Sequence, residues 1–593
     1  MTDVPESTPS SPETTDTVAR TVTSQWRKTS WLIPLGLLLL FVVSAFATRL
    51  VKKATLPYTP EASADLETQP VQGGVFRFPL VTTVRTLDPA QAKFSLDVML
   101  TQQLYDGLTA FDKHLNIVPA LAKFWEISPD GRTYTFELRE DARFHNGRRV
   151  TAEDCVFSFE RLLTAGLNEH NYHYYSRIDG AEAFRRGDVD VVAGLTALDD
   201  RTFQIRFNTP FVPALSVLSM YSSKILPKKE LLERGPDFFL QPIGTGAFQF
   251  ARWIKPEEDP GVPQVDGIWQ GLRFEANDAY FGGRPYLDAV VFRAVYNDRG
   301  YRGAAQPLHQ VADCLQTNEV ETYADWIPVE ANQLLAISYL YFPNRVPPYN
   351  DPRVRRAINL ALDKRSFLDA QSVTAGIPAA TGIVPPGIPG FIPKGSDSGQ
   401  NLERAKALLA EAGYPAGEGL PPLELPILRG AELRGSGAAD SCLVSCLSQI
   451  GVEVRLVKVE RFEELSGYAD RNRAVLSQDT WYADFPDPDN FLRPLFHSHG
   501  PINRFGYANV EVDRLLDQVW SETSYSTRAK LYHRIEEIVL NDAPIIPTDY
   551  GRLRFLLRPT VRGFTLTPLG TPYIKLKDIW LAEEEGPGAE VEL

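Results

Sequence analysis

The sequence predicts an α/β protein of two or three folding units, and three observations support this. The chain has 593 residues, which is too long for a single hydrophobic core. Hydrophobic residues make up 44% and charged residues 23%, as in ordinary globular proteins. From about residue 71 onwards, segments with helical spacing of apolar residues alternate with segments of strand-like spacing, without an internal repeat.

The first 70 residues are predicted to lie outside the folded part. Residues 1–30 are rich in Ser, Thr and Pro and are expected to be disordered. Residues 31–48 form an uncharged apolar run that could be a short membrane helix or the core of a signal peptide. Small residues at 45 and 47 fit a cleavage site, whereas the long polar segment in front favours retention. We predict a retained anchor, followed by a linker over 49–70.

Two local patterns define the first predicted elements of the folded part. Apolar and polar residues alternate over 134–138, which predicts a half-buried strand. Thr151 and Asp154 have the spacing of a capping box, which predicts a helix through about residue 163.

The C-terminal half contains further helix starts and strands. Asp351 followed by Pro352 predicts the start of one helix, and Asn401 predicts the start of another. A strand is expected over 452–457, and a last long helix over about 527–542.

Residues 481–491 (WYADFPDPDNF) form the most informative segment of the chain. The segment places three carboxylates among four aromatic rings and two prolines, and it cannot be regular helix or central strand. A rigid loop of this kind suits a ligand with a cationic end and an apolar body. On composition alone, an Asp-Pro turn with buried aromatic rings is the favoured alternative.

Composition and motifs exclude several classes of function. The net charge of −14 argues against a nucleic-acid partner. Four cysteines are too few for a disulfide scaffold, and Cys442 and Cys446 are interpreted as small buried residues of one helix face. The histidine pairs 170/173 and 497/499 have no convincing third ligand nearby, so no metal is expected. Phosphate-loop, nucleophile-elbow and zinc-protease motifs are missing, which predicts a protein without cofactor that is not an enzyme.

A series of local patterns in fixed order resembles the extracellular solute-binding proteins of peptide- and nickel-type ABC importers. The similarity covers roughly 71–580, and its motifs lie at 86–89 (TLDP), 103–108 (QLYDGL), 130–139 (DGRTYTFELR), 144–147 (FHNG), 151–161, 242–246 (PIGTG), 277–283 (NDAYFGG), 348–357, 405–414, 481–491 and 532–547. No single motif is decisive, but their number and order are specific.

The resemblance implies a two-lobed class II periplasmic-binding-protein fold without chemistry of its own. Lobe I would comprise 71–105, 236–297 and 541–585, with 106–235 as an inserted subdomain. Lobe II would comprise 298–540, and 586–593 would be an acidic tail. A ligand enclosed between the lobes would shift the balance towards a closed form that an ABC permease recognises.

The resemblance also assigns roles within the 481–491 loop. Asp484 matches the aspartate that pairs with the α-amino group of a bound peptide in relatives, and Trp481 and Phe485 could form walls of that site. Asp487 and Asp489 are interpreted as scaffolding of the turn. Outside the loop, His145 and Asp154 fall in the inserted subdomain and are expected to be structural.

The implied function is that of a membrane-tethered receptor, with the folded domain on the extracytoplasmic side of the cell membrane and a single pass at 31–48. It would deliver a small solute, by default a short peptide, to ABC permease subunits. The segment 315–342 departs from the family pattern, with Asn318 and Glu321 in place of glycine and aspartate. A sensor or assembly subunit without transport is therefore the alternative, and an acidic hydrolase is a third hypothesis without positive support.

Overall fold

The structure is a computed structural model, and it describes residues 69–80, 84–255, 271–294, 312–317, 325–331, 334–371, 377–388, 391, 399–428, 436–460, 464, 468 and 475–583. By contacts the chain divides into Met1–Gln69 and Pro70–Leu593, and every described element belongs to the second unit. The segments 1–30, 31–48 and 586–593, and nearly all of 49–70, lie outside these ranges. Within them, no helix is both long and apolar enough to cross a membrane.

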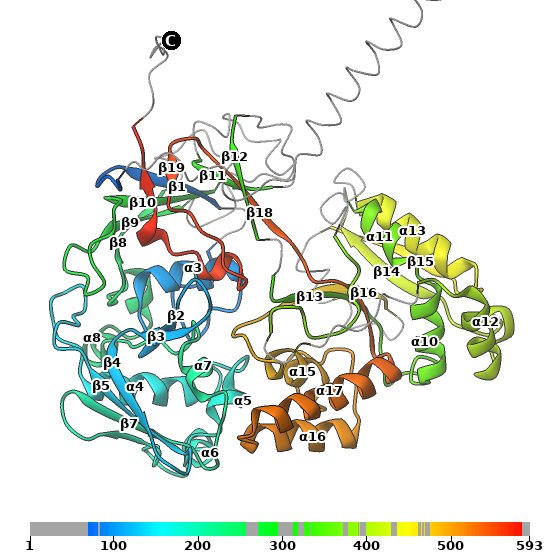
Figure 1. Ribbon diagram of the computed structural model, residues 1–593, viewed down its shortest axis with the longest axis horizontal. Coiled ribbons are helices and arrows are strands. Elements are labelled where there is room, and N and C mark those ends of the chain that lie inside the picture. Colours follow the sequence, from blue (N-terminus) through cyan, green and yellow to red (C-terminus); the bar gives the residue numbers. More distant parts are fainter. Residues whose placement is uncertain are drawn as a thin grey trace, which may run out of the picture. The chain divides into compact units, whose positions relative to one another are not determined.

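A four-stranded sheet forms the first part of the fold (Figure 1). Its strand order is β1 (Val75–Leu80), β10 (Ala289–Ala294), β9 (Gly271–Ala276) and β8 (Phe248–Ile254). Strands β1 and β10 are parallel and the other pairs are antiparallel. Helix α3 (Ser95–Leu104) contributes Met99, Leu100 and Leu104 to the same hydrophobic core.

Residues 106–235 form a second group of elements. Their antiparallel sheet has the order β4 (Ala122–Ile127), β5 (Thr133–Leu138), β7 (Thr202–Arg206), β6 (Leu195–Ala197), and a hairpin joins β2 (Thr109–Phe111) to β3 (Ile117–Pro119). The helices are α4 (Ala152–Leu163), α5 (Tyr172–Tyr175), α6 (Ala181–Arg186), α7 (Ala214–Leu218) and α8 (Lys228–Arg234). The predicted strand over 134–138 and the capping box of Thr151 and Asp154 are both confirmed.

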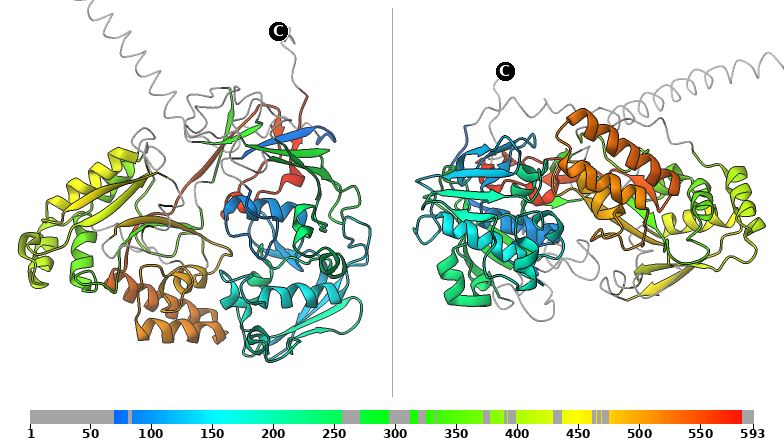
Figure 2. Two further views of the ribbon diagram at one scale, coloured as in Figure 1. Left: turned by 180° about the vertical axis from the view of Figure 1, so that it is seen from behind. Right: turned by 90° about the horizontal axis from the view of Figure 1, so that it is seen from below.

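The remaining elements surround two further sheets. Strand β13 (Ala336–Tyr341) lies between β16 (Ser477–Tyr482) and β17 (Ile545–Asp549), and β14 (Leu423–Leu428) pairs in parallel with β15 (Val454–Val459). The helices are α10 (Pro352–Ala361), α11 (Lys364–Ala370), α12 (Leu402–Glu411), α13 (Ser436–Ser448), α15 (Asp489–Phe496), α16 (Val510–Ser521) and α17 (Tyr525–Asp542). Figures 1 and 2 show α15, α16 and α17 packed together, and α10 to α13 gathered around β14 and β15.

The helix starts predicted in this part are confirmed by their capping bonds. The Asp351 side chain accepts the backbone N–H of Arg353, and the Asn401 side chain accepts that of Arg404. Helix α17 begins slightly earlier than predicted, because the Ser524 side chain caps it.

The chain passes between the first and third groups of elements at two places. Strands β11 (Cys314–Gln316) and β12 (Ile327–Ala331) both pair with β18 (Leu553–Leu557), while β17 just before β18 pairs with β13. The small pair of β19 (Val561–Arg562) and β20 (Trp580–Leu581) follows. Strands β17 and β18, which follow one another in the chain, therefore belong to different sheets. The lobe bounds at 298 and 541 stay predictions.

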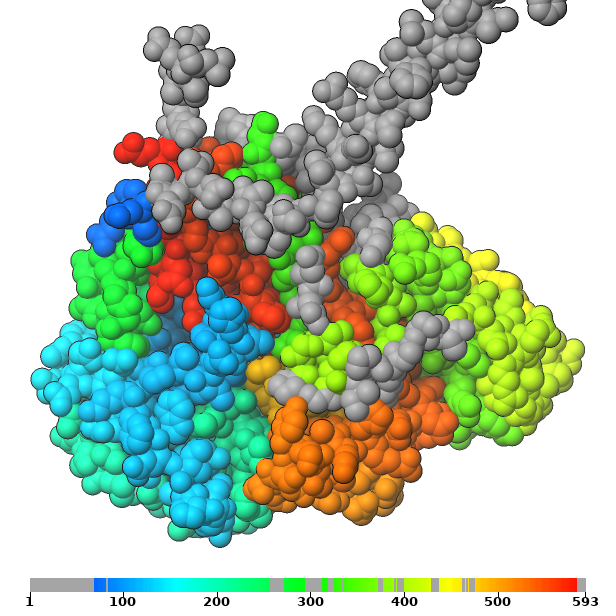
Figure 3. Space-filling model, viewed as in Figure 1, coloured from blue at the N-terminus to red at the C-terminus, as the bar shows by residue number. Residues whose placement is uncertain are grey.

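The group of residues 106–235 contacts α15 and α16 directly. The rings of Phe211 and Trp520 lie 5.6 Å apart, and the backbone N–H of Val212 donates to the Trp520 carbonyl at 3.2 Å. Figure 3 shows the orange surface of α15 to α17 against the cyan surface of this group. One continuous hydrophobic core includes residues from both sides of the contact, among them Tyr174 and Phe485.

Candidate functional site

The loop between β16 and α15 is held in place by Asn490. The Trp481 indole N–H donates to the Asn490 carbonyl at 2.7 Å. The Asp484 backbone N–H donates to Asn490 Oδ1 at 2.8 Å, and Asn490 Nδ2 donates to the Tyr174 hydroxyl at 3.0 Å. A single buried amide therefore fixes the turn and ties it to α5.

Asp484 is a partly buried carboxylate without a cation. In the described part of the chain, its carboxylate accepts a hydrogen bond only from Asn490 Nδ2, which donates to Oδ2 at 3.3 Å. Among the described residues, no Lys, Arg or His lies within ion-pair distance of it. Burial raises the pKa of Asp484 to about 7, and the Asn490 bond opposes the shift. A negative charge at this position is therefore unfavourable until a cation arrives.

The negative charge of Asp484 acts on four buried tyrosines. Burial raises the pKa of Tyr174, Tyr175, Tyr221 and Tyr573, and the negative charge of Asp484 adds to the shift in each case. The Tyr573 hydroxyl also donates to the Asp484 carbonyl at 2.8 Å. Aromatic rings around a carboxylate form an environment suited to an organic ammonium group.

The other two carboxylates of the loop have cationic partners. Asp489 is fully buried and accepts bonds from Arg493 Nε at 3.2 Å and from the Trp520 indole at 2.9 Å. Asp487 accepts bonds from Arg528 at 3.1 Å and from the Tyr532 hydroxyl at 3.0 Å. These contacts agree with the predicted scaffolding role of both residues.

The predicted wall residues lie beside Asp484 but have structural contacts. Trp481 is 9% exposed, and its ring lies 5.7 Å from that of His170. Phe485 is 0% exposed and packs edge to face on Tyr174 at 5.2 Å. A ligand role for these two side chains stays a prediction.

Three positions outside the loop have structural partners. His145 Nδ1 accepts the backbone N–H of Gly244 at 3.0 Å, and its other ring nitrogen lies 3.1 Å from the Gly246 carbonyl. A Cβ at Gly244 would lie 1.8 Å from the Leu104 carbonyl oxygen, so this position requires glycine. Asp154 caps α4 and binds Arg148 with both oxygens at 2.9 Å.

Cys442 and Cys446 share one face of α13, as their spacing predicts. Their sulfur atoms lie 4.0 Å apart; Cys446 is buried and Cys442 is only partly so. Within the described ranges, no group of three His, Cys, Asp or Glu side chains is placed to hold a metal ion.

Sequence reasoning missed the tyrosines and Asn490. Tyr174, Tyr175 and Tyr221 come from the 106–235 group, and Tyr573 comes from a 3₁₀ turn near the C-terminus. The aromatic run at 172–175 was a usable signal for the first two. Nothing in the sequence indicated that residue 573 would lie beside residue 484.

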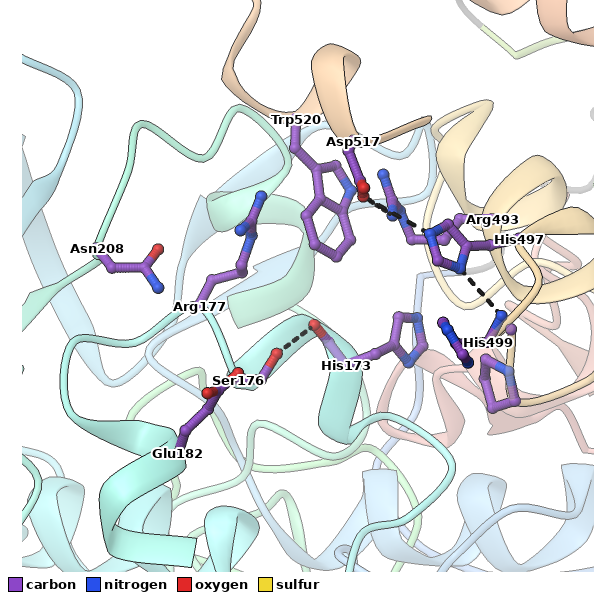
Figure 4. A pocket seen from close by; sticks show the side chains of 12 residues that line it. His173, Ser176, Arg177, Glu182, Asn208, Arg493, His497, His499, Asp517 and Trp520 are labelled. Atoms are coloured by element: carbon purple, nitrogen blue, oxygen red, sulfur yellow. Dashed lines mark hydrogen bonds and ion pairs between the residues drawn. The ribbon is translucent and has the colours of Figure 1, made fainter. Parts of the chain in front are cut away.

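A cavity of about 370 Å³ lies between α5 and α6 on one side and α15 and α16 on the other (Figure 4). Its lining includes His173, which directly precedes Tyr174 in α5, and Arg493, which binds Asp489. The altered positions Asn318 and Glu321 lie outside the described part of the chain.

The described elements form a mixed α/β fold, and the chain superimposes on periplasmic peptide-binding proteins, which are two-lobed. The family "Bacterial extracellular solute-binding proteins, family 5 Middle" matches residues 116–502, and the chain belongs to this family. Its members are substrate-binding proteins.

Two curated proteins and one solved structure illustrate the similarity. The chain is 31% identical over 500 residues to heme-binding protein A of Haemophilus influenzae, covering 79% of this chain and 86% of that protein. It is 26% identical over 571 residues to the dipeptide-binding protein of Escherichia coli, covering 92% and 97%. A periplasmic binding protein from Helicobacter pylori, DppA in complex with peptide STSA, superimposes with a TM-score of 0.70 at 25% identity and covers 86% of this chain and 99% of that one.

Proposed function

We propose that this protein is the solute receptor of an ABC importer and that it captures a short peptide through the α-amino group. The observation that carries the proposal is the Asp484 carboxylate, which is partly buried, lacks a cation and faces tyrosines. An ammonium group would supply the missing counter-charge and would itself be shielded from water.

The ligand preference follows from the hydrogen bonds and the charge that Asp484 offers. A peptide α-amino group carries three N–H donors. Within the described part of the chain, the Asp484 carboxylate accepts only one long hydrogen bond, from Asn490, so its oxygen atoms can accept more. A neutral or anionic group at this position would leave the carboxylate unpaired or repelled. Relatives named as binding dipeptides or crystallised with a tetrapeptide support the same class of ligand.

Isothermal titration calorimetry with a free-amino tripeptide library tests the proposal. Asp484→Asn is expected to weaken binding about 100-fold, because a charged hydrogen-bonded pair inside a protein contributes roughly 3 kcal/mol. N-acetylation of the peptide should weaken binding to the wild type similarly and should have little further effect on the variant.

Asp199→Asn is the matched control, because Asp199 lies in an exposed turn before β7. It should bind as the wild type does. Unchanged affinity of Asp484→Asn, or equal binding of acetylated and free peptides by the wild type, would refute the amine-pairing role.

The proposal extends to the location of the protein. Residues 31–48 would act as an uncleaved single-pass anchor that holds residues 71–585 on the extracytoplasmic side, next to the permease. N-terminal sequencing of the mature protein tests the anchor. A mature chain that starts at Thr48 would show cleavage and would rule out tethering.

A further inference from the structure

The cavity between α5–α6 and α15–α16 contains an unpaired guanidinium group. The Arg177 guanidinium lies 4.3 Å from the centre of the Trp520 ring, and Nε has no hydrogen-bond acceptor. Within the described ranges, no carboxylate lies within ion-pair distance of it. Burial lowers the pKa of Arg177, which shows that the charge is held against a desolvation penalty.

Other inward-facing arginines in the same part of the molecule have carboxylate partners. Arg161 binds both oxygens of Asp88, and Arg493 binds Asp489 and Asp517. Arg528 binds Asp487. Arg177 is therefore an exception, and its planar fork of donors remains available in a cavity.

The acidic residues that line the cavity are engaged elsewhere. Asp517 lies 3.1 Å from Arg493 Nη1, and Glu182 lies 3.9 Å from Arg186. Within the described ranges neither of them forms an ion pair with Arg177, although their negative charges, with that of Asp489, raise its pKa against the effect of burial. Figure 4 shows the Arg177 side chain beside the Trp520 ring and away from Asp517.

Imidazole groups add further hydrogen-bonding capacity to the same cavity. Within the described ranges, the two buried ring nitrogens of His173 have no partner at hydrogen-bond geometry. Burial lowers the pKa of His173 well below its usual range, and the backbone of His170 opposes this shift. Neutral His173 therefore has one N–H donor to offer. His499 is exposed at the rim, and its backbone N–H donates to His497 Nδ1 at 3.1 Å.

We propose that this cavity binds a small oxyanion, a carboxylate or a phosphate, through the Arg177 guanidinium and the His173 imidazole. A guanidinium group matches the geometry of both oxyanions and binds them with two parallel bonds. Arg177 and His173 belong to the 106–235 group, whereas Trp520, His497 and His499 belong to the α15–α16 side. The anion therefore stabilises the contact between the two sides, and its binding is coupled to closure around the solute.

The oxyanion could be a free ion or the terminal carboxylate of the bound peptide. The first arm of the test uses inorganic phosphate alone, with the full-length protein and no peptide, in calorimetry and thermal unfolding. Phosphate stabilises many proteins by exclusion from their surface, so the informative signal is saturable binding that depends on Arg177.

Arg177→Gln is expected to reduce phosphate affinity at least about tenfold, because it removes a charge-assisted bidentate contact. His173→Gln should reduce it less, since it removes one neutral donor. Arg201→Gln is the matched control, because Arg201 pairs with Glu140 on the surface, outside the cavity. It should leave phosphate affinity unchanged.

The second arm rests on the proposed function and compares a tripeptide with its C-terminal amide. If the peptide carboxylate is the anion, amidation weakens binding to the wild type at least about tenfold and has no effect on Arg177→Gln. If a free ion occupies the cavity, phosphate strengthens binding of both peptides to the wild type only.

Two results together overturn the proposal. Phosphate either does not bind or binds independently of Arg177, and amidation of the peptide has the same effect on the wild type and on Arg177→Gln. Loss of peptide binding altogether would contradict the proposed function, but the phosphate arm would still decide the anion site. The two failures are therefore distinguishable.

Discussion

Two adjoining regions of one loop hold their carboxylates in opposite ways. In the first, around Asp484, the carboxylate has a single weak hydrogen bond and faces tyrosines without a cation. In the second, Asp487 and Asp489 each accept bonds from a buried arginine and from an aromatic N–H or O–H donor. Only a few residues of chain separate these two environments.

The difference shows how the molecule divides structure from recognition. A buried carboxylate with an internal cation fixes the fold, because its charge is already compensated. A buried carboxylate without an internal cation carries an uncompensated negative charge, which a cationic ligand can compensate. Arg177 is the positively charged counterpart, since among the described residues its guanidinium group forms no ion pair with a carboxylate.

The largest expected contrast is in stability. Asp489→Asn should lower the free energy of unfolding by about 3 kcal/mol, because it leaves buried Arg493 with less compensation. Asp484→Asn should not lower the free energy of unfolding, because no internal cation loses its partner. Urea denaturation at pH 7.5 measures both values. Equal destabilisation by the two substitutions would contradict the proposed difference between Asp484 and Asp489.

The next effect is the pH dependence of peptide binding. Burial raises the pKa of Asp484 to about 7, so the free protein must lose a proton there before it can pair with an ammonium group. Affinity for a free-amino peptide should therefore fall about 20-fold between pH 7.5 and 5.5. Asp484→Asn should bind weakly with little pH dependence, and an equally steep profile in the variant would assign the titration to another group.

Stability without ligand should show the opposite dependence on pH. The folded-state pKa of Asp484 is raised above its unfolded value, so the folded form binds its proton more tightly. The resulting stability is fully present below about pH 4 and is lost as the pH rises through about 7. Relative to Asp484→Asn, the wild type should lose about 1.5 kcal/mol across this interval, allowing for solvent screening. Parallel stability curves for the two proteins would show that Asp484 is not desolvated in solution.

Part of the fold and of the candidate site is predictable from the sequence, because local chemistry determines it. The rest depends on tertiary contacts. The caps at Thr151, Asp351 and Asn401 were predictable, because each acts within one turn of its own helix. The internal partners of Asp487 and Asp489 agree with the turn-building role expected for them, whereas the ligand role of Asp484 stays a prediction. The tyrosine surroundings could not be predicted, because Tyr221 and Tyr573 reach Asp484 only through the folded chain.

The lobe bounds show the same limit on sequence reasoning. Strands β17 and β18 are adjacent in sequence but belong to different sheets. Both are strands of five residues, and the sequence of so short a strand does not specify its partners. Phe485 illustrates the point for a single side chain, since an aromatic residue next to a binding aspartate can equally pack in the core, and its ring is fully buried here.

The smallest effect concerns the bond that joins the two regions to α5. Tyr174→Phe removes the hydroxyl that accepts Asn490 Nδ2 at 3.0 Å and should cost about 1 kcal/mol of stability. The Nδ2 group of Asn490 then keeps only the 3.3 Å bond to Asp484 Oδ2, so we expect that bond to shorten and to lower the pKa of Asp484. The midpoint of the pH profile for peptide binding should therefore move below that of the wild type. Tyr525→Phe, on an exposed residue, is the matched control and should change neither stability nor midpoint. A midpoint that stays in place while stability falls would show that Asn490 supports the turn without tuning Asp484.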